Sequence, residues 1–323
     1  MIKNWLVAGL LLFNSPCYSE TPKKVTIALG YASGGVNDVA SKILAKHLGK
    51  YIPGNPTVTV ENHPGAGGLT VLKKLDSIFS KDGTYIVNFN SGLLLDAILE
   101  DDYSVDFKNY SWIGSSSKDY NICYVNSKLP IKSFEDLINY KDKFYFSSST
   151  TNNIIWYYQK ILQNYVDNSV IITGFKSNPE TQLAVIRNEV SATCSQWGPS
   201  TIPSYERGEI VPIVSFSKQP LVNSPNNITY INNLIMDTET RKIISFFSSA
   251  TSLFRPYVMS KDTPLDQVAI IRKAFELTML DVDFIEDNKK VSIIVDSTSY
   301  KDVDSILDNM SKVDKKKLKE YIK

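Results

Sequence analysis

Three segments rich in glycine, serine and asparagine carry the residue types best suited to bind an anionic ligand. They are residues 30–38 (GYASGGVND), 61–68 (ENHPGAGG) and 147–153 (SSSTTNN). Each is predicted to connect a strand to a helix, because it separates a β-branched or aromatic run from apolar residues at helical spacing. The first N–H groups of a helix are unpaired and carry about half a positive charge, and glycine lets the backbone approach a ligand closely. The pattern predicts a carboxylate site built from backbone donors, without need of arginine or lysine.

The candidate ligand-binding residues lie in these segments and just after one later strand. Glycine-rich turns also occur for packing reasons alone, so ligand binding is one of two interpretations. Asp38 either complements the dipole of the helix that begins there, or fixes its loop, or meets an amine on the ligand. Tyr31 either covers the ligand or packs on the surface, and Trp197 either lines the site or belongs to the core. The full set is Tyr31, Ser33, Gly34, Gly35, Asp38, Asn62, Pro64, Gly65, Ala66, Gly67, Gly68, Ser148, Ser149, Thr150, Thr151, Asn152, Gln196 and Trp197.

Nucleotide, metal and hydrolase chemistry fit the sequence poorly, and no cofactor is expected. Residues 65–70 (GAGGLT) have threonine where a dinucleotide fingerprint needs its third glycine, and residues 30–37 lack the lysine of a P-loop. A metal site or a Ser-His hydrolase would have to use His47 or His63, the only histidines, with Ser33 as the nucleophile. His63 is better explained as a loop residue, so an enzyme is the weaker hypothesis.

The elements that would position these segments alternate along the chain, which is typical of an α/β protein. We expect strands at residues 25–29, 58–60, 85–89, 122–125, 144–146, 170–173, 190–194, 211–216 and 253–259. We expect helices over residues 36–51, 69–79, 134–140, 154–165, 180–187 and 265–280, and two more around Val303 and Lys315.

The length of 323 residues exceeds what one hydrophobic core usually organises, so two lobes are expected. Lobe one is predicted from residues 20–118 and 245–323, and lobe two from residues 119–244. The chain would then cross between the lobes twice.

Residues 1–19 are predicted to be a secretory signal peptide, because Lys3 precedes a short apolar run that ends before Cys17 and Ser19. The run is shorter than the ~20 apolar residues that cross a bilayer. A lipoprotein acylated on Cys17 is the alternative, and bulky neighbours disfavour it. Removal of Lys3 would take the net charge from +1 to about zero, which argues against a nucleic-acid partner.

Cys123 and Cys194 would remain after export, in an oxidising compartment. Both lie in apolar, strand-like runs. They form either a disulfide or two buried thiols that behave as small apolar side chains.

The first two loops resemble those of the substrate-binding receptors of tripartite tricarboxylate transporters, also called Bug-type receptors. Residues 34–40 (GGVNDVA) and 60–68 (VENHPGAGG) carry the resemblance, and PGAGG is its most specific part. Similar segments continue over nearly the whole mature chain, at residues 81–85, 144–151, 174–183, 188–192, 254–256, 263–264 and 272–275. The chain departs from the family at Ala32 and Ser33, where proline is usual, and at Ser41, Lys42, Asn188 and Ser191. These departures keep the backbone donors and leave the identity of the ligand open.

The resemblance implies a type II periplasmic binding-protein fold, in which two α/β lobes enclose a ligand cleft and are joined by two hinge crossings. It implies a monomeric periplasmic receptor, not an enzyme. The receptor would capture a small organic carboxylate, such as a di- or tricarboxylate or an acidic amino acid, and deliver it to the membrane permease subunits. One carboxylate would lie between the first two loops, and the distal end would meet the third. A sensor that presents the ligand to a membrane receptor kinase is the alternative.

Overall fold

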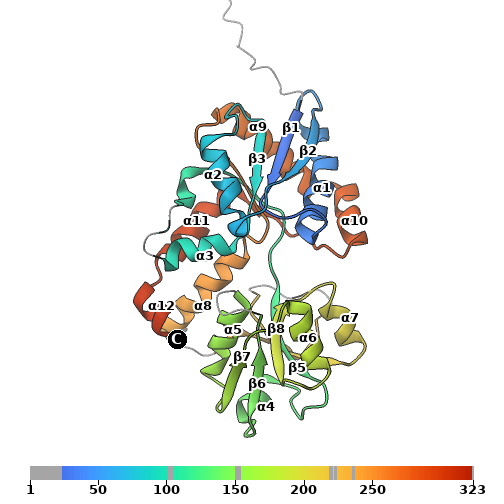
Figure 1. Cartoon of the computed structure of the whole chain (residues 1–323), viewed down its shortest axis with the longest axis vertical. Helices are drawn as coiled ribbons and strands as arrows, with labels where there is room; N and C mark the ends of the chain where they lie inside the picture. Colours follow the sequence, from blue (N-terminus) through green and yellow to red (C-terminus); the bar gives the residue numbers. More distant parts are fainter. Residues whose placement is uncertain are drawn as a thin grey trace, which may run out of the picture.

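The chain folds into two α/β lobes, each built on a six-stranded mixed sheet (Figure 1). The computed structural model describes residues 24–100, 103, 105–149, 154–217, 221, 224–234 and 237–321. The two lobes confirm the predicted fold class. The predicted signal peptide, residues 1–19, lies outside the described residues.

The sheet of lobe one has the strand order β12-β4-β11-β3-β1-β2. Strands β2, β1 and β3 are parallel, and β11 is antiparallel to both β3 and β4. The strands are β1 (Lys24–Leu29), β2 (Thr57–Asn62), β3 (Tyr85–Asn88), β4 (Tyr110–Ser115), β11 (Pro256–Ser260) and β12 (Thr298–Ser299).

The sheet of lobe two has the strand order β10-β9-β5-β8-β6-β7. Strands β7, β6 and β8 are parallel, and β5 is antiparallel to both β8 and β9. The strands are β5 (Asn121–Asn126), β6 (Phe144–Ser147), β7 (Ser169–Ile172), β8 (Ala192–Gln196), β9 (Ile210–Ser215) and β10 (Thr229–Tyr230).

The two sheets repeat one arrangement, which no sequence repeat indicated. In each, three parallel strands are followed by an antiparallel strand, which is β11 in lobe one and β5 in lobe two. Strand β1 of lobe one therefore corresponds to β6 of lobe two, and β3 corresponds to β8. Ligands of open α/β sheets bind beyond the carboxyl ends of the strands. A ligand bound between the lobes would therefore contact the segments that follow β1 and β3 in lobe one and β6 and β8 in lobe two.

The helices cover the sheets and include several that the sequence pattern did not predict. Lobe one carries α1 (Val36–Leu48), α2 (Leu69–Ser77), α3 (Gly92–Leu99), α9 (Leu265–Met279), α10 (Val282–Lys290), α11 (Tyr300–Ser311) and α12 (Lys315–Tyr321). Lobe two carries α4 (Phe134–Asn139), α5 (Ile154–Gln163), α6 (Asn178–Ile186) and α7 (Thr201–Glu206). Short 3₁₀ turns are η1 (Gly49–Tyr51), η2 (Ala66–Gly68), η3 (Phe107–Asn109) and η4 (Ile231–Asn233). Within the described part of the chain, no helix combines the length and apolar character needed to cross a membrane.

Strand β1 illustrates why the loops meet at one edge of lobe one. Val25 and Ile27 belong to the same apolar cluster as Leu44 of α1, whereas Ala28 belongs to the cluster that contains Val71 of α2. Side chains alternate between the two faces of a strand, so helices cover both faces of β1. Its carboxyl end is thereby held rigidly where the loop at residues 30–35 begins.

The lobes are joined through residues 116–120, between β4 and β5, and through the return from β10 to β11. Helix α8 (Thr238–Thr251) lies in that return and contacts α3 and α11 of lobe one. Its Phe247 also stacks on Tyr157 of α5 in lobe two, with ring centroids 5.1 Å apart. The predicted lobe limits at 118/119 and 244/245 stay predictions; the second falls inside this helix.

Cys123 of β5 and Cys194 of β8 are joined by a disulfide. The two residues stand directly opposite each other in the antiparallel pair. The crosslink joins two central strands of the sheet in lobe two.

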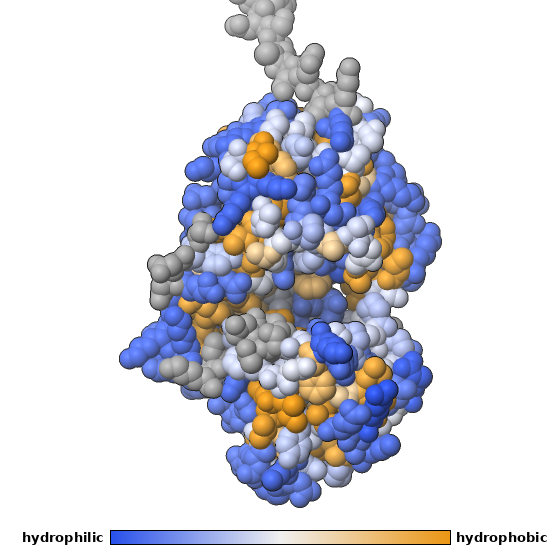
Figure 2. Space-filling view, in the orientation of Figure 1, coloured by the Kyte–Doolittle hydropathy of each residue, from blue (hydrophilic) through white to orange (hydrophobic). Residues whose placement is uncertain are grey.

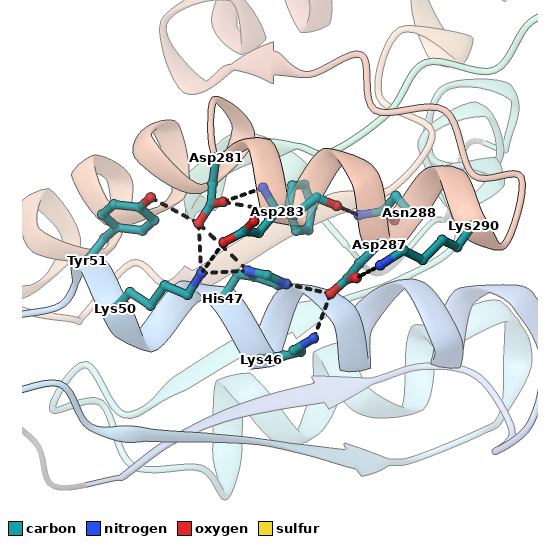
Figure 3. A network of polar contacts seen from close by, with 10 residues as sticks. Lys46, His47, Lys50, Tyr51, Asp281, Asp283, Asp287, Asn288 and Lys290 are labelled. Carbon is teal, nitrogen blue, oxygen red and sulfur yellow. Dashed lines mark hydrogen bonds and ion pairs between the residues drawn. The ribbon is translucent and has the colours of Figure 1, made fainter.

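A network of charged side chains ties helix α10 to helix α1 (Figure 3). His47 is buried, and its Nε2 lies 2.9 Å from Asp287 Oδ2. Lys50 Nζ and Tyr51 Oη donate to Asp281 at 3.1 and 3.0 Å. Burial opposes ionisation of Asp281, but the hydrogen bonds from Lys50, Tyr51 and the backbone outweigh it and lower its pKa to about 2. His47 therefore has a structural role, since it helps to orient α1.

Candidate functional site

The first predicted loop is organised by the carboxylate of Asp38. Its Oδ2 accepts hydrogen bonds from Gly34 N at 2.8 Å and Lys42 Nζ at 2.7 Å, and its Oδ1 accepts one from Asn62 Nδ2 at 3.0 Å. Burial alone would raise the pKa of Asp38, but these hydrogen bonds lower it to about 2. Of the interpretations open for Asp38, the geometry supports the one in which it fixes its loop.

The second loop is held against the first by one side chain and by close backbone packing. Asn62 Nδ2 also donates to Tyr31 O at 3.0 Å. A Cβ added to Gly30 would lie 2.6 Å from Gly68 Cα, so glycine is required where the loops touch. Residues 65–68 all have positive φ, from +45° at Ala66 to +147° at Gly65. This left-handed stretch turns the chain from β2 into α2.

Both loops end in helix N-termini that no side chain caps. Gly35 precedes α1 and Gly68 precedes α2, and neither residue can supply a capping oxygen from a side chain. The first N–H groups of both helices therefore lack the usual side-chain acceptor. Val36 and Gly67, at these two helix starts, each line one of the cavities described below.

The third predicted segment is described only in part, since Thr150, Thr151 and Asn152 lie outside the described residues. Ser148 is buried, and its backbone N–H donates to Ile172 O at 2.9 Å. Ser149 Oγ donates to Asn178 Oδ1 at 3.2 Å. Asn178 begins helix α6 and lines the larger cavity, so this segment borders the site from lobe two.

The surface is hollowed between the two lobes (Figure 2). The larger hollow, here called the Arg255 cavity, has a volume of about 410 Å³, and the smaller, the Asp119 cavity, about 300 Å³. Both contain residues from each lobe. The Arg255 cavity is lined by Val36, Lys118, Tyr120, Asn178, Pro179, residues 195–200, Arg255 and residues 292–294. The Asp119 cavity is lined by Ala66, Gly67, residues 90–93, Leu95, Asp96, Asp119, Ile154, Tyr157, Ala250, Thr251 and Phe254.

Several predicted residues line these cavities and others lie beside them. Ala66 and Gly67 line the Asp119 cavity, and Gln196 and Trp197 line the Arg255 cavity. Trp197 is only 1% exposed and its ring lies 5.7 Å from that of Tyr205, so it is a core residue whose edge forms part of the wall. The residues of the set that line neither cavity are Tyr31, Ser33, Gly34, Gly35, Asp38, Asn62, Pro64, Gly65, Gly68, Ser148 and Ser149.

Arg255 is a cleft residue that the sequence pattern did not indicate. Its side chain is buried, its Nε donates to Asn37 Oδ1 at 3.0 Å and its Nη1 donates to Ser117 Oγ at 2.7 Å. Burial lowers its pKa from the ordinary arginine value. The expectation of a site without arginine did not include this buried cation, which lines the Arg255 cavity. The available signal was a lone cation inside the otherwise apolar run at residues 253–259.

Tyr31 lies close enough to Arg255 for the two groups to influence each other. Burial raises the pKa of the Tyr31 hydroxyl above its ordinary value, and Arg255 opposes the rise. The residue is half-buried, and both interpretations of its side chain stay open.

The hydrolase and metal hypotheses gain no support from the geometry. Ser33 Oγ lies 3.4 Å from Asp38 Oδ2, whereas His63 Nδ1 lies 3.0 Å from Lys74 Nζ. No hydrogen bond joins Ser33 to His63 within the described part of the chain. No cluster of three or more metal-binding side chains occurs among the residues that the structure describes.

No family model matches the sequence, and no curated protein matches it. Solved structures do match its fold. A TctC solute binding protein from Polaromonas aligns over 94% of this chain and 99% of its own, with a TM-score of 0.75 and 13% identity. The periplasmic binding protein BugD aligns over 93% and 95%, with a TM-score of 0.57 and 16% identity. MatC from Rhodopseudomonas palustris, solved with bound malate, aligns over 94% and 100%, with a TM-score of 0.59 and 15% identity. At these identities the likeness establishes the fold, which is that of the TctC and Bug solute-binding proteins.

Proposed function

We propose that this protein is a periplasmic solute-binding receptor that holds a small organic carboxylate between its two lobes. It delivers the solute to a tripartite tricarboxylate-type membrane transporter, without chemical turnover. The carboxylate lies at the carboxyl ends of β1 and β2 and reaches lobe two through the segment after β6. The solved structures similar in fold include MatC with malate and an R. palustris protein with adipate, and their carboxylate ligands support this reading.

The buried guanidinium of Arg255 is the single observation that carries the proposal. It forms hydrogen bonds with two neutral side chains, Asn37 and Ser117, and no ion pair with any described carboxylate. A buried charge is unfavourable unless it is paired. A carboxylate that enters the cleft supplies that partner and gains a charge-assisted hydrogen bond.

Uncapped helix starts add to the attraction for an anion. The N-termini of α1 and α2 lie beside the cleft and carry partial positive charge. Water molecules can bridge a carboxylate to such N–H groups with little loss of affinity.

A thermal-shift screen on the mature chain, unfolded and refolded to remove bound ligand, tests the binding function. The panel consists of mono-, di- and tricarboxylates, amino acids and neutral analogues. A ligand at a hundred times its dissociation constant adds ~2.7 kcal/mol, which corresponds to a rise of several degrees in melting temperature. A selective shift with one carboxylate is expected, and no shift with any of them would contradict the proposal.

Arg255→Lys separates the proposed role of the guanidinium from a general effect on folding. Lysine keeps the charge but lacks the planar fork that pairs with a carboxylate. The shift with the identified carboxylate should therefore fall strongly. Arg272→Lys is the matched control, because Arg272 Nε donates to Trp112 O in lobe one, outside both cavities.

Uptake of the labelled solute by cells with and without the gene distinguishes delivery from sensing. Loss of uptake in cells that lack the protein is the expected result. Normal uptake, combined with loss of a transcriptional response to the solute, would favour the sensor.

A further inference from the structure

Asp119 lines the Asp119 cavity and has one buried carboxylate oxygen that no donor among the described residues satisfies. Asp119 lies in the crossing segment 116–120, where its backbone N–H donates to Thr251 O at 2.8 Å. Its Oδ2 accepts a hydrogen bond from Asn121 Nδ2 at 2.8 Å. Its Oδ1 is buried and has no hydrogen-bond partner among the described residues. Because a buried acceptor without a donor is unfavourable, this position calls for a donor from the ligand.

The charged residues that line this cavity are acidic. Asp96, from α3, and Asp119 are its only ionisable acids, and no lysine or arginine is among the described residues that line it. Burial raises the pKa of Asp96, and Glu100 adds to the effect. A second carboxylate of a ligand placed here would be repelled, whereas a cationic group would be attracted.

Arg255 supplies a positive charge on the adjacent stretch of chain. Its carbonyl oxygen accepts a hydrogen bond from Ser116 N at 3.1 Å, and its guanidinium reaches Ser117. Arg255 and Asp119 each influence the pKa of the other, yet no ion pair joins them. Arg255 and Asp119, which line neighbouring cavities, therefore interact electrostatically without forming an ion pair.

We propose that the solute is a carboxylate that also bears an ammonium group, of the α-amino acid type, and that Asp119 selects it. The ammonium donates to Asp119 Oδ1, while the carboxylate pairs with Arg255 and the helix starts. This inference rests on the proposed function, because it concerns the ligand of the same cleft. A hydroxyl group could satisfy Oδ1 but would leave the negative charge without a partner.

The proposal implies that binding strengthens as pH rises. Burial raises the pKa of Asp119 to about 6, although Asn121 and Arg255 lower it in part. The other titratable groups that influence it or line its cavity are Arg255, Tyr31, Tyr157, Tyr158 and Asp96. The three tyrosines have pKa values above their ordinary range and the arginine stays charged, so of these only Asp96 shares the acidic range. A ligand with an ammonium group binds ionised Asp119 more tightly than the protonated form. The affinity for such a ligand is therefore highest well above pH 6 and decreases as pH falls through 6. A ligand with a second carboxylate instead of the ammonium shows the opposite slope.

Isothermal titration calorimetry on the ligand-free mature chain tests the proposal with matched pairs. The pairs are aspartate with succinate, glutamate with glutarate, and alanine with propionate, at pH 7.5 and pH 5.0. At least one amino acid should bind tenfold or more tightly than its deamino partner. Its affinity should fall about tenfold from pH 7.5 to pH 5.0, which is the effect of one linked proton.

Asp119→Asn should abolish both the preference for the amino acid and the pH dependence. Asp167→Asn is the control, since Asp167 is exposed on lobe two and lines neither cavity. If Asp119→Asn does not fold, the paired affinities and the pH slope of the natural protein still decide the question.

The outcomes separate this inference from the proposed function. Deamino acids that bind as tightly as the amino acids at pH 7.5, or amino acids whose affinity does not fall between pH 7.5 and pH 5.0, would overturn the role of Asp119 and leave the receptor function intact. No binding by any member of the six at pH 7.5, together with no carboxylate hit in the thermal-shift screen, would overturn both.

Discussion

The role of a buried charged residue in this protein depends on whether it is paired with other groups of the fold. Asp38 is surrounded by donors and serves its loop, whereas Arg255 has neutral partners and is left available to a ligand. Both are buried. The difference between a structural and a binding charge is therefore the identity of its neighbours.

Asp38→Asn should lower the free energy of unfolding at pH 7 by about 2 kcal/mol, because the pKa falls from 3.8 to about 2 on folding. A carboxylate whose pKa is lower in the folded state stabilises the fold at pH values above its unfolded pKa. This stabilisation is lost as pH falls through the folded pKa. The difference between variant and natural protein should therefore shrink between pH 4 and pH 2. Urea unfolding at pH 7 and at pH 2.5 measures it. Asp302→Asn, at an exposed site in α11, is the control, and an equal loss at both pH values would contradict the explanation.

At the scale of elements, the loop between β2 and α2 is shaped by four consecutive positive φ angles. Such a run exposes backbone donors and is accessible mainly to glycine. The motif PGAGG is therefore a conformational requirement as well as a sign of ligand binding. Gly67 is the position where these two requirements can be separated, since it lines a cavity.

Gly67→Val should weaken binding of the identified carboxylate at least tenfold, because its side chain would enter the Asp119 cavity beside Leu93. Gly208→Val is a matched control. Gly208 has a similar φ of +70°, against +63° for Gly67, and an added Cβ would contact nothing within 4 Å. Both variants bear a similar backbone cost of ~1–2 kcal/mol, so melting temperatures should fall alike. Near-normal affinity in a folded Gly67→Val protein would count against the site.

The disulfide between β5 and β8 should contribute about 4 kcal/mol, since it closes a loop with a sequence separation of 71 residues. Replacement of both Cys123 and Cys194 by serine should lower the urea midpoint. A reducing agent should lower the midpoint of the natural protein by a similar amount and leave the variant unaffected. An unchanged midpoint of the natural protein after verified reduction would refute the prediction.

At the scale of the whole molecule, the cleft lies between two lobes that are joined by residues 116–120 and by the return through α8. Asp119 lies in the first connection and Arg255 at the end of the second, so a ligand that contacts them also touches the hinge region. Ligand contacts that exist only when the lobes are close would stabilise a closed form.

The bound solute should reduce the radius of gyration measured by small-angle X-ray scattering. The change should be absent in Arg255→Lys at the same ligand concentration, provided that calorimetry shows the variant to be unoccupied. An unchanged radius in the saturated natural protein would mean that binding does not close the lobes.

The sequence by itself determined the α/β class, two lobes and the strand-to-helix loops, because these depend on local periodicity and on glycine at special positions. It missed strand β4 and helices α3, α7, α8 and α10. Helix α3 (GLLLDAIL) has an apolar run without clear amphipathic spacing, and α10 (VDFIEDNKK) is mostly polar. Their helical state is decided by packing against distant elements.

Only the tertiary structure decided which charges border the cleft. Strand β11 returns from the last third of the chain to lie between β3 and β4, and this places Arg255 beside the crossing segment that holds Asp119. The two residues are far apart in the sequence, and the burial and pairing of a charge arise from contacts that no local pattern encodes. The loops could therefore be predicted from their composition, whereas the charge pattern of the cleft could not.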